Sequence, residues 1–300
     1  MDKVAVIIVT YNGMKWLRRC LNDLFQSIIP IQVFIIDNGS QDGTLDFVER
    51  HYPQIRLIKS KENLGFGKAN NIGIAKAYED GFDYFFLLNQ DGYVSPETIA
   101  NLVKIAKLNP DFGVLSPIQL NGTGDNLDLN FSILMNNNNC PGFINDSYFD
   151  KLKDYYDVKF VMAAFWLITR ETIRKIGFFN PVYPHYGEDN DYLNRVLYHG
   201  KKVAVVSDAV GLHDREFREM TRSKEIYSWY IDLLIRVSDL NKNFSLEVGR
   251  SILFFVKRMC LSLLKFQRED AVLNAKYFFA FLLKQFLVIH RERSKNKIIK

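Results

Sequence analysis

Polar side chains follow three apolar stretches in the first hundred residues of this chain. The three polar clusters are Thr10-Tyr11-Asn12, Asp37-Asn38-Gly39-Ser40 and Asn89-Gln90-Asp91. Each combines hydroxyl, amide or carboxylate groups that can bind a nucleotide, its phosphates or a cation. An aspartate in such a turn also commonly caps the following helix, and this structural alternative stays open for each cluster taken alone.

Two aspartates in these clusters, and a histidine later in the chain, have side chains that could bind a base or a metal ion. Asp37 can accept the ring N–H of a base such as uracil or thymine. Asp91 can bind a divalent cation through oxygen, and the cation can bridge a diphosphate and neutralise the charge that grows on a leaving group. His213 is a further candidate metal ligand, although a lone histidine is more often structural.

A richer acidic cluster, Glu188-Asp189-Asn190-Asp191, occurs later in the chain. Asp191 and Arg195 are four residues apart, so a helix would pair them and give Asp191 a structural role. Asp189 and Glu188 fall at or before the predicted start of that helix. A carboxylate there can act as general base on an acceptor hydroxyl, and neighbouring carboxylates raise one another's pKa. Acids are also common at helix N-termini for structural reasons, which is the alternative.

The elements that would position these side chains alternate between strand and helix. Strand-like runs cover residues 4–9, 32–37, 55–59 and 83–88, and helical patterns cover residues 14–27, 45–51 and 65–78 and begin again near 95. This alternation predicts an α/β fold with a doubly wound, mostly parallel sheet. Ligands bind beyond the carboxyl ends of the strands in such sheets, so the three polar clusters should share one edge.

The second half of the chain is less regular. Residues 110–160 show no clear period, and Asn136–Asn139 indicates an exposed loop. Strands are expected at 160–169 and 202–206, and helices at 170–176 and 191–199, the latter ended by Gly200.

The amino-acid composition limits the kind of protein that this chain can be. Hydrophobic residues make up 48% and charged residues 24% of 300 residues, which is typical of a folded chain with a large core. A net charge of +5 is too small to indicate nucleic-acid binding. Three cysteines without metal or redox spacing favour a reducing compartment, here the cytoplasm. We expect neither a signal peptide nor a transmembrane helix.

Positive charge is concentrated at the C-terminal end. Residues 222–300 hold 16 Lys and Arg against 7 Asp and Glu, whereas the rest holds 23 against 27. Two amphipathic helices are predicted at 251–267 and 271–290, and Lys257, Arg258, Lys265 and Arg268 fall within about 100° on the first. This pattern predicts peripheral attachment to an anionic membrane. The alternatives are a solvated face, packing on the rest of the chain, or a homodimer through these helices.

Taken together, the pieces resemble a known family. The chain resembles the family 2 glycosyltransferases, which have the GT-A fold, and more narrowly the rhamnosyltransferase-like branch that builds bacterial surface polysaccharides. The resemblance runs from Val4 to about Phe217. It is carried, in order, by residues 9–12, 36–43 (IDNGSQDG), 62–73 (ENLGFGKANNIG), 88–91 (LNQD), 176–179 (IGFF) and 186–191 (YGEDND), with Arg195 and His213.

The resemblance implies a role for each matching residue. Asp189 would be the general base, and Glu188 would be the second catalytic residue of the pair. Asp91 would be the last residue of the Asp-x-Asp metal motif, and His213 would complete the metal shell. Asp37 would contact the base. The nucleotide-sugar would lie among Thr10, Tyr11, Asn12, Asp37, Asn38, Asn63, Gly65, Asn70, Asn89 and Gln90.

Four departures from the family pattern are visible, and one of them is that the tail does not clearly match the branch's usual Arg-Asn segment. Asn89 stands at the first aspartate of the metal motif and is a neutral, weaker ligand. Asn70 stands where related enzymes often carry an arginine near the diphosphate. Asn180-Pro181 replaces the usual Asp-Glu pair on the acceptor side.

These residues predict an inverting glycosyltransferase. A glycosyltransferase domain would span residues 1–221, and a basic helical tail would span residues 222–300. The enzyme would use a UDP- or dTDP-sugar, Mg²⁺ or Mn²⁺, and a saccharide or lipid-linked acceptor at the cytoplasmic face of the membrane. The alternatives are a sugar-phosphate nucleotidyltransferase, which needs a Gly- and basic-rich phosphate loop after the first strand, and a non-catalytic scaffold of the same fold.

Overall fold

The computed structural model describes residues 2–183, 185–216 and 219–298. Its strands are β1 (Val4–Thr10), β2 (Ile31–Asp37), β3 (Arg56–Lys59), β4 (Tyr84–Asn89), β5 (Gly92–Val94), β6 (Phe112–Asn121), β7 (Tyr155–Asp157), β8 (Phe165–Thr169) and β9 (Lys202–His213). They form a mixed sheet in the order β3-β2-β1-β4-β8-β6-β9-β5, with β7 paired to β9.

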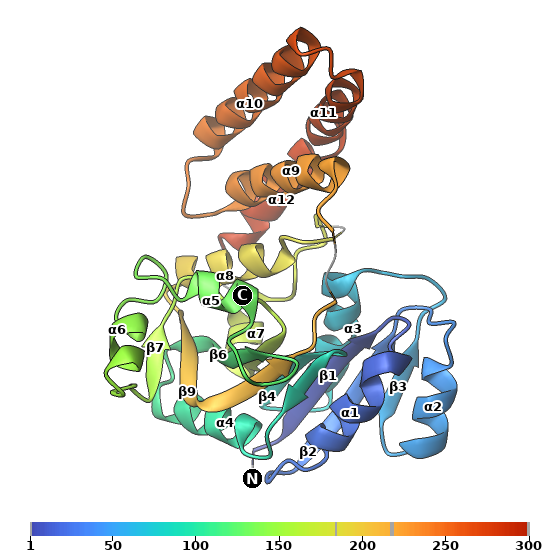
Figure 1. Cartoon of the computed structure of the whole chain (residues 1–300), viewed down its shortest axis with the longest axis vertical. Helices are drawn as coiled ribbons and strands as arrows, with labels where there is room; N and C mark the ends of the chain where they lie inside the picture. Colours follow the sequence, from blue (N-terminus) through green and yellow to red (C-terminus); the bar gives the residue numbers. More distant parts are fainter. Residues whose placement is uncertain (1, 184, 217–218, 299–300) are drawn as a thin grey trace.

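Helices cover both faces of this sheet (Figure 1). Those of the first two hundred residues are α1 (Met14–Leu24), α2 (Thr44–His51), α3 (Phe66–Glu79), α4 (Thr98–Leu108), α5 (Leu129–Leu134), α6 (Phe143–Tyr148), α7 (Arg170–Ile176) and α8 (Glu188–Tyr198). Helices α1, α2 and α4 pack into one hydrophobic cluster, and α3, α7 and α8 pack into a second one on the opposite face. Both faces of the central strands are therefore buried, which explains their continuous apolar sequences.

The first half of the sheet follows the sequence prediction and the second half departs from it. Strands β1 to β4 are parallel to one another, but β8 runs antiparallel to both β4 and β6. The sheet is therefore mixed rather than mostly parallel. The long strand β6 was not expected, because Gly113 and Pro117 interrupt its apolar pattern. Its register against β9 shifts at both of these points.

Smaller predictions also have clear outcomes. The loop at Asn136–Asn139 exists, and its first three residues are exposed. Gly200 has a positive φ of 74°, as expected of a residue that ends a helix. Helix α8 begins at Glu188, earlier than expected, so the acidic pair lies in its first turn. Strand β9 is twice the predicted length and ends at His213.

The C-terminal helices form a separate layer above the sheet (Figure 1). They are α9 (Arg222–Ser238), α10 (Phe244–Leu264), α11 (Arg268–Ala280) and α12 (Phe286–Asn296), and a π-helical turn, η1 (Phe281–Gln285), joins the last two. We call residues 222–298 the tail. A third hydrophobic cluster holds the tail together, and Val182 and Tyr183 from the sheet domain belong to it. The division at residue 222 stays a prediction.

Two predictions about the tail need correction. Arg268 cannot share a face with Lys257 and Lys265, because α10 ends at Leu264 and the chain turns before α11 begins. The continuous helix Arg268–Asn296 is also long and apolar enough to cross a membrane, with a mean hydropathy of 1.5 over its best window. We expected no such segment, but an apolar window of this length tolerates a few charged side chains. Core helices of soluble proteins have the same length and composition but are mostly buried, whereas only 17% of this apolar window is buried in the structure.

Candidate active site

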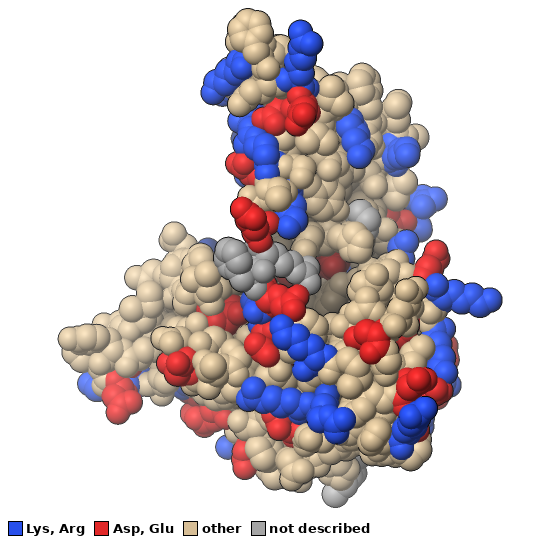
Figure 2. Space-filling model, turned by 45° about the vertical axis from the view of Figure 1, so that its right-hand side comes forward, with Lys and Arg blue, Asp and Glu red and all other residues tan. Residues whose placement is uncertain are grey.

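The three polar clusters meet at one edge of the sheet, as predicted. Strands β1, β2 and β4 are adjacent and parallel, and Thr10 lies opposite Asp37 while Val9 lies opposite Asn89. Their carboxyl ends therefore deliver the residues that follow them to a common edge. The surface is hollowed where this edge faces the tail (Figure 2).

Asp37 organises the loop after β2. Its carboxylate is fully buried and accepts hydrogen bonds from the Thr10 and Ser40 hydroxyls and from the backbone N–H groups of Gly39 and Ser40. A carboxylate has about four acceptor positions, so these four donors use its capacity. The structure thus gives Asp37 a role in shaping the pocket wall, and its direct contact with a base stays a prediction.

Gln90 ties the end of β4 to the end of β1. Its amide accepts from the Tyr11 N–H at 2.9 Å and donates to the Tyr11 carbonyl at 3.2 Å. Asn12 adopts a left-handed backbone with φ of 48°, donates through its N–H to Ser40 and accepts from the N–H of Gln41. The Tyr11 ring, in contrast, is 47% exposed at this edge, and it can stack on a nucleobase.

The segment before α3 forms the next wall of the site. The Asn38 amide accepts from the Leu64 N–H, and the Asn63 amide accepts from the Gly65 N–H. Gly65 has a φ of +80°, which favours glycine there. Asn70 is buried in α3 and donates to the Phe66 carbonyl one turn earlier. Its amide therefore stabilises the helix locally.

The two predicted metal ligands lie together. His213 Nε2 is 3.4 Å from an Asp91 carboxylate oxygen, and the Asn89 amide nitrogen is 3.4 Å from the same His213 nitrogen. Strands β5 and β9 bring them together, because their antiparallel pairing places Gly92 opposite His213. One carboxylate and one imidazole are donors that Mn²⁺ or Mg²⁺ accepts. No described group of three or more Asp, Glu, His or Cys side chains could hold a metal alone, so a diphosphate would have to supply further ligands.

Sequence analysis missed two residues behind this pair. The buried Asp128 has a carboxylate oxygen 4.0 Å from His213 Nδ1, on the opposite side of the ring from Asp91. Arg215 donates to the same Asp128 oxygen at 2.7 Å. His213 Nδ1 is buried without a hydrogen bond among the described residues. Asp128 thus lies behind the imidazole without a hydrogen bond to it, in the irregular stretch 110–160, where no pattern singled it out.

The acidic pair begins α8, with Glu188 buried and Asp189 half-buried. Glu188 is 6% exposed, and its Oε2 atom has no partner among the described residues. Burial raises the pKa of Glu188 to about 7. Burial also raises the pKa of Asp189, although hydrogen bonds from Asn190 and from the Ala163 backbone oppose the shift. Both carboxyl groups can therefore bind a proton more readily than an ordinary carboxylate does.

Short chain segments lead from the acidic pair to the other parts of the candidate site. The Ala163 backbone acts on Asp189 as a hydrogen-bond donor that lowers its pKa, and the carbonyl of the next residue, Ala164, accepts from the N–H of Asn89. On the other side, a Cβ placed on Gly67 at the start of α3 would lie 3.5 Å from the Glu188 side chain. We therefore expect the candidate base, the metal-binding edge and the wall before α3 to border one site.

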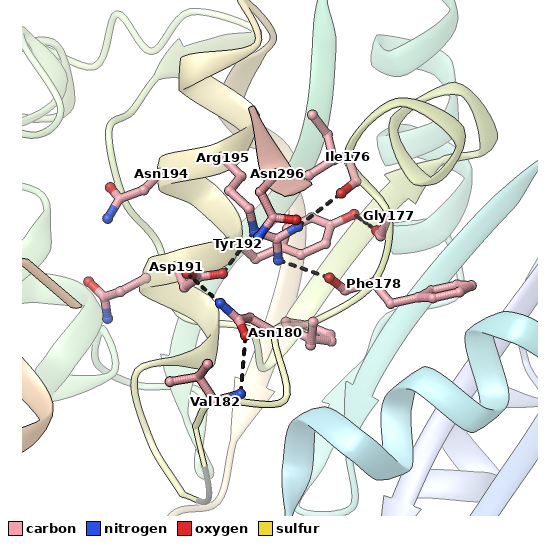
Figure 3. Close-up of polar contacts among 12 residues, drawn as sticks. Ile176, Gly177, Phe178, Asn180, Val182, Asp191, Tyr192, Asn194, Arg195 and Asn296 are labelled. Carbon is pink, nitrogen blue, oxygen red and sulfur yellow. Dashed lines mark hydrogen bonds and ion pairs between the residues drawn. The ribbon is translucent and has the colours of Figure 1, made fainter. Parts of the chain in front are cut away.

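Asp191 holds α8 in place, as its spacing to Arg195 predicted. The Arg195 Nε donates to Asp191 at 2.8 Å, and both side chains are 3% exposed. The guanidinium also donates to the carbonyls of Ile176 and Phe178, and Asn180 donates to the second Asp191 oxygen (Figure 3). These bonds fix the loop that precedes α8, so Asn180 has a structural role where the family usually has an acidic pair.

The tail contacts the loop that leads into α8. Gly187 has a φ of +89°, and a Cβ there would lie 2.9 Å from Ile231 of α9 and 3.0 Å from the Tyr183 ring. The Tyr227 hydroxyl of α9 donates to the carbonyl of His185. Helix α9 therefore presses directly on the segment that positions Glu188 and Asp189. Sequence analysis did not foresee this contact.

Comparison with known proteins supports the same assignment. A model of the family described as glycosyl transferase family 2 matches residues 5–177. The chain belongs to this family. An N-acetylglucosaminyl-diphospho-decaprenol L-rhamnosyltransferase from Mycobacterium tuberculosis is 33% identical over 126 residues, which are 39% of this chain and 41% of that protein. The chain thus spans less than half of that relative's length.

Solved structures share the fold. TarS residues 1–349 from Staphylococcus aureus, in complex with UDP-GlcNAc, superpose with a TM-score of 0.58 at 16% identity, over 99% of this chain and 82% of that one. GalNAc-T7 with UDP, GalNAc and Mn²⁺ gives a TM-score of 0.57 at 15% identity, over 81% and 52% of the two chains. The fold is GT-A with a C-terminal helical extension, and family membership argues against the nucleotidyltransferase alternative.

Proposed function

We propose that the protein is an inverting glycosyltransferase that moves a hexosyl or rhamnosyl group from a UDP- or dTDP-sugar to a hydroxyl of a saccharide or lipid-linked acceptor. The observation that carries this proposal is the position of Asp189. It is a half-buried carboxylate in the first turn of α8, its pKa is raised by burial, and the Ala163 backbone beside it leads to Ala164, which pairs with Asn89 at the end of β4. The mycobacterial relative, named for a diphospho-decaprenol acceptor, supports a lipid-linked acceptor and a role in cell-surface polysaccharide synthesis.

The chemistry follows from this arrangement. Asp189 takes the proton from the acceptor hydroxyl as the oxygen attacks the anomeric carbon from the face opposite the leaving diphosphate, so the configuration inverts. Asp91 and His213 would hold Mg²⁺ or Mn²⁺, and a metal there neutralises charge on the leaving diphosphate. Tyr11 stacks on the base, and the hydrogen bonds of Asp37 and Gln90 hold the walls of the base-binding pocket in place.

The acid pair is tested by two neighbouring variants. Asp189→Asn should lower transfer by at least about 10²-fold, because general bases contribute 10²–10⁴-fold, and it should leave donor binding unchanged. Glu188→Gln should retain most of the transfer rate. The rate of the wild type should rise with pH through the raised pKa of the base. If Asp189→Asn kept more than about a tenth of the rate, the assignment of the base would be wrong.

The donor and the metal are tested together by calorimetry. UDP and dTDP, each with and without Mn²⁺, should bind more tightly with the metal, and Asp91→Asn should remove this difference. A protein that binds neither nucleotide would be a non-catalytic scaffold. A panel of nucleotide sugars, assayed for release of nucleoside diphosphate, identifies the donor.

We further propose that the tail attaches the enzyme peripherally to the cytoplasmic face of the membrane. Its net positive charge and the apolar side chains exposed along α10 and α11 support this location. Helix α12 is tied to the protein through Ile289 and through Arg293, which donates to the carbonyls of Val237 and Lys242. Because these contacts hold α12 against the rest of the protein, they favour a helix that lies on the membrane over one that crosses the bilayer. A homodimer through the tail is the alternative.

A further inference from the structure

A cavity of about 360 Å³ lies inside the tail, away from the active site. Its walls come from α9, from the end of α10 and from the turn before α11. The side chains that matter to its chemistry are Arg222, Trp229, Arg258, Lys265 and Gln267. Nothing in the glycosyl transfer reaction uses these residues.

The cavity has a small excess of positive charge. Two carboxylates outweigh the charge of Arg222, which donates to Asp270 at 2.8 Å and to Glu225 at 2.6 Å. Arg258 and Lys265 form no ion pair with any described residue. The Arg258 guanidinium lies 3.8 Å from the centre of the Trp229 ring, and its buried Nε makes no hydrogen bond among the described residues. These two cations, one of them over an indole, thus remain available to an anion and leave the cavity with a net positive charge.

The backbone of the turn between α10 and α11 is largely satisfied. Three of the last four carbonyls of α10 accept hydrogen bonds, because the N–H groups of residues 265–267 donate to Leu261, Leu263 and Ser262. Gln267 precedes α11 without a side-chain capping bond, and Glu269 and Asp270 in the first turn already complement the positive end of the helix dipole. The attraction of an anion to the cavity therefore comes from the side chains Arg258 and Lys265.

The same turn presents apolar side chains to the outside. Leu263 and Leu264 are 62% and 75% exposed, and Phe266 is 89% exposed. Phe266 also has a φ of +55°, a left-handed conformation that disfavours a bulky residue. Glycine or asparagine would fit this turn with less strain, so folding does not account for the phenylalanine. Cationic side chains flank the apolar turn along the tail surface (Figure 2).

We propose that this cavity binds the phosphate of an anionic phospholipid while Leu263, Leu264 and Phe266 enter the bilayer beside it. Arg258 and Lys265 pair with the phosphate, and the apolar turn contacts the acyl chains of the same lipid layer. Only a lipid combines the two features, because a free phosphate would leave the exposed turn without a partner. The proposal rests on the membrane attachment proposed above and names the site that makes it.

Vesicle sedimentation with matched variants tests the cavity. Phosphatidylcholine vesicles with and without phosphatidylglycerol are compared. Arg258→Gln and Lys265→Gln should each lower partitioning onto the anionic vesicles by at least about tenfold, because each loses a charge-assisted hydrogen bond to phosphate. Lys257→Gln removes the same charge from the same helix outside the cavity and should cost at most about fivefold. An equal loss in Lys257→Gln and Arg258→Gln would mean diffuse attraction and would overturn the proposal.

The apolar turn is tested independently of charge. Phe266→Gly should lower partitioning by roughly tenfold or more, since a large apolar side chain no longer enters the bilayer, while its thermal midpoint stays equal or rises. Unchanged partitioning would overturn the role of the turn. Saturable binding of inorganic phosphate without any vesicle binding would assign the cavity to a soluble anion and would also overturn the proposal.

Donor hydrolysis without acceptor provides the control on the enzyme itself. All of these variants should release nucleoside diphosphate at the wild-type rate. If hydrolysis fails in the wild type, the proposed transfer reaction is wrong, whereas vesicle partitioning still reports on the cavity. The two failures are therefore distinguishable.

Discussion

Glu188 is a buried carboxyl group whose free energy of burial depends on pH. Its pKa is raised from 4.5 to about 7, so the folded protein binds this proton more tightly than the unfolded chain does. Its contribution to stability is therefore present below pH 4.5, falls as the pH rises towards 7 and is lost above that. The cost at high pH is at most about 3 kcal/mol.

Glu188→Gln should remove this pH dependence. We expect the variant to be more stable than the wild type at pH 8, by up to about 3 kcal/mol, and equally stable near pH 4. Urea unfolding across this pH range measures the difference. Substitution of the exposed Glu62 by glutamine is the control and should leave the profile unchanged. If the free energy of unfolding of Glu188→Gln changed with pH in parallel with that of the wild type, Glu188 would not be desolvated in the folded protein.

Single residues also show what sequence could and could not predict. The polar clusters after β1, β2 and β4 were placed correctly, because parallel neighbouring strands must end at one edge. The pairing of Asp91 with His213 rested on resemblance to the family, and the structure brings the two together. Asp128 could not be found, since its contact with His213 depends on how a stretch without clear periodicity crosses the sheet.

The elements around Gly187 connect the tail to the catalytic loop. Gly187→Ala should lower the free energy of unfolding by about 2–4 kcal/mol, because a methyl group would overlap Ile231 and Tyr183 in addition to the strain of a positive φ. It should also lower the transfer rate, since the start of α8 must move. Thermal unfolding and the transfer rate measure the two effects.

Gly43→Ala is the matched control for this element. Gly43 precedes α2 as Gly187 precedes α8, with a similar left-handed backbone (φ of +87°) but nothing within 4 Å of its Cβ position, so only the backbone cost of about 1 kcal/mol is expected. Adding Ile231→Ala to Gly187→Ala should recover part of the loss. Equal effects of the two glycine substitutions would mean that α9 does not press on the loop.

At the element level, strong periodicity was predicted well and interrupted patterns were not. The first four strands and three helices of the sheet agree with their predicted positions within a few residues. Strand β6 was missed because Gly113 and Pro117 lie inside it, and its formation depends on the pairing with β9. Helix α9 lies inside the predicted helical tail but was not predicted as an element of its own.

On the scale of the whole molecule, the tail and the sheet domain share a hydrophobic cluster. A chain that ends at Asn243 would lose Phe255, Phe281 and Ile289 from that cluster, as well as the hydrogen bonds of Arg293 to α9 and the loop after it. We expect it to unfold at a markedly lower temperature and to lose transfer as well as vesicle binding. Calorimetry of the full chain should show one cooperative transition. A truncated chain with normal activity would show that the tail is an independent module.

The π-helical turn η1 marks a place where this chain could lose one residue and keep its fold. Eight residues separate Phe281 from Ile289, and both face the tail core. In a regular α-helix eight residues overshoot two turns by about 80°, whereas seven fall about 20° short. The π turn absorbs the surplus residue, as a one-residue insertion in an older α-helix would. Deleting the exposed Leu283 should therefore restore a regular helix with Ile289 and Arg293 still facing inward. It should leave the thermal midpoint nearly unchanged, whereas deleting Val256 from the regular α10 should lower it sharply.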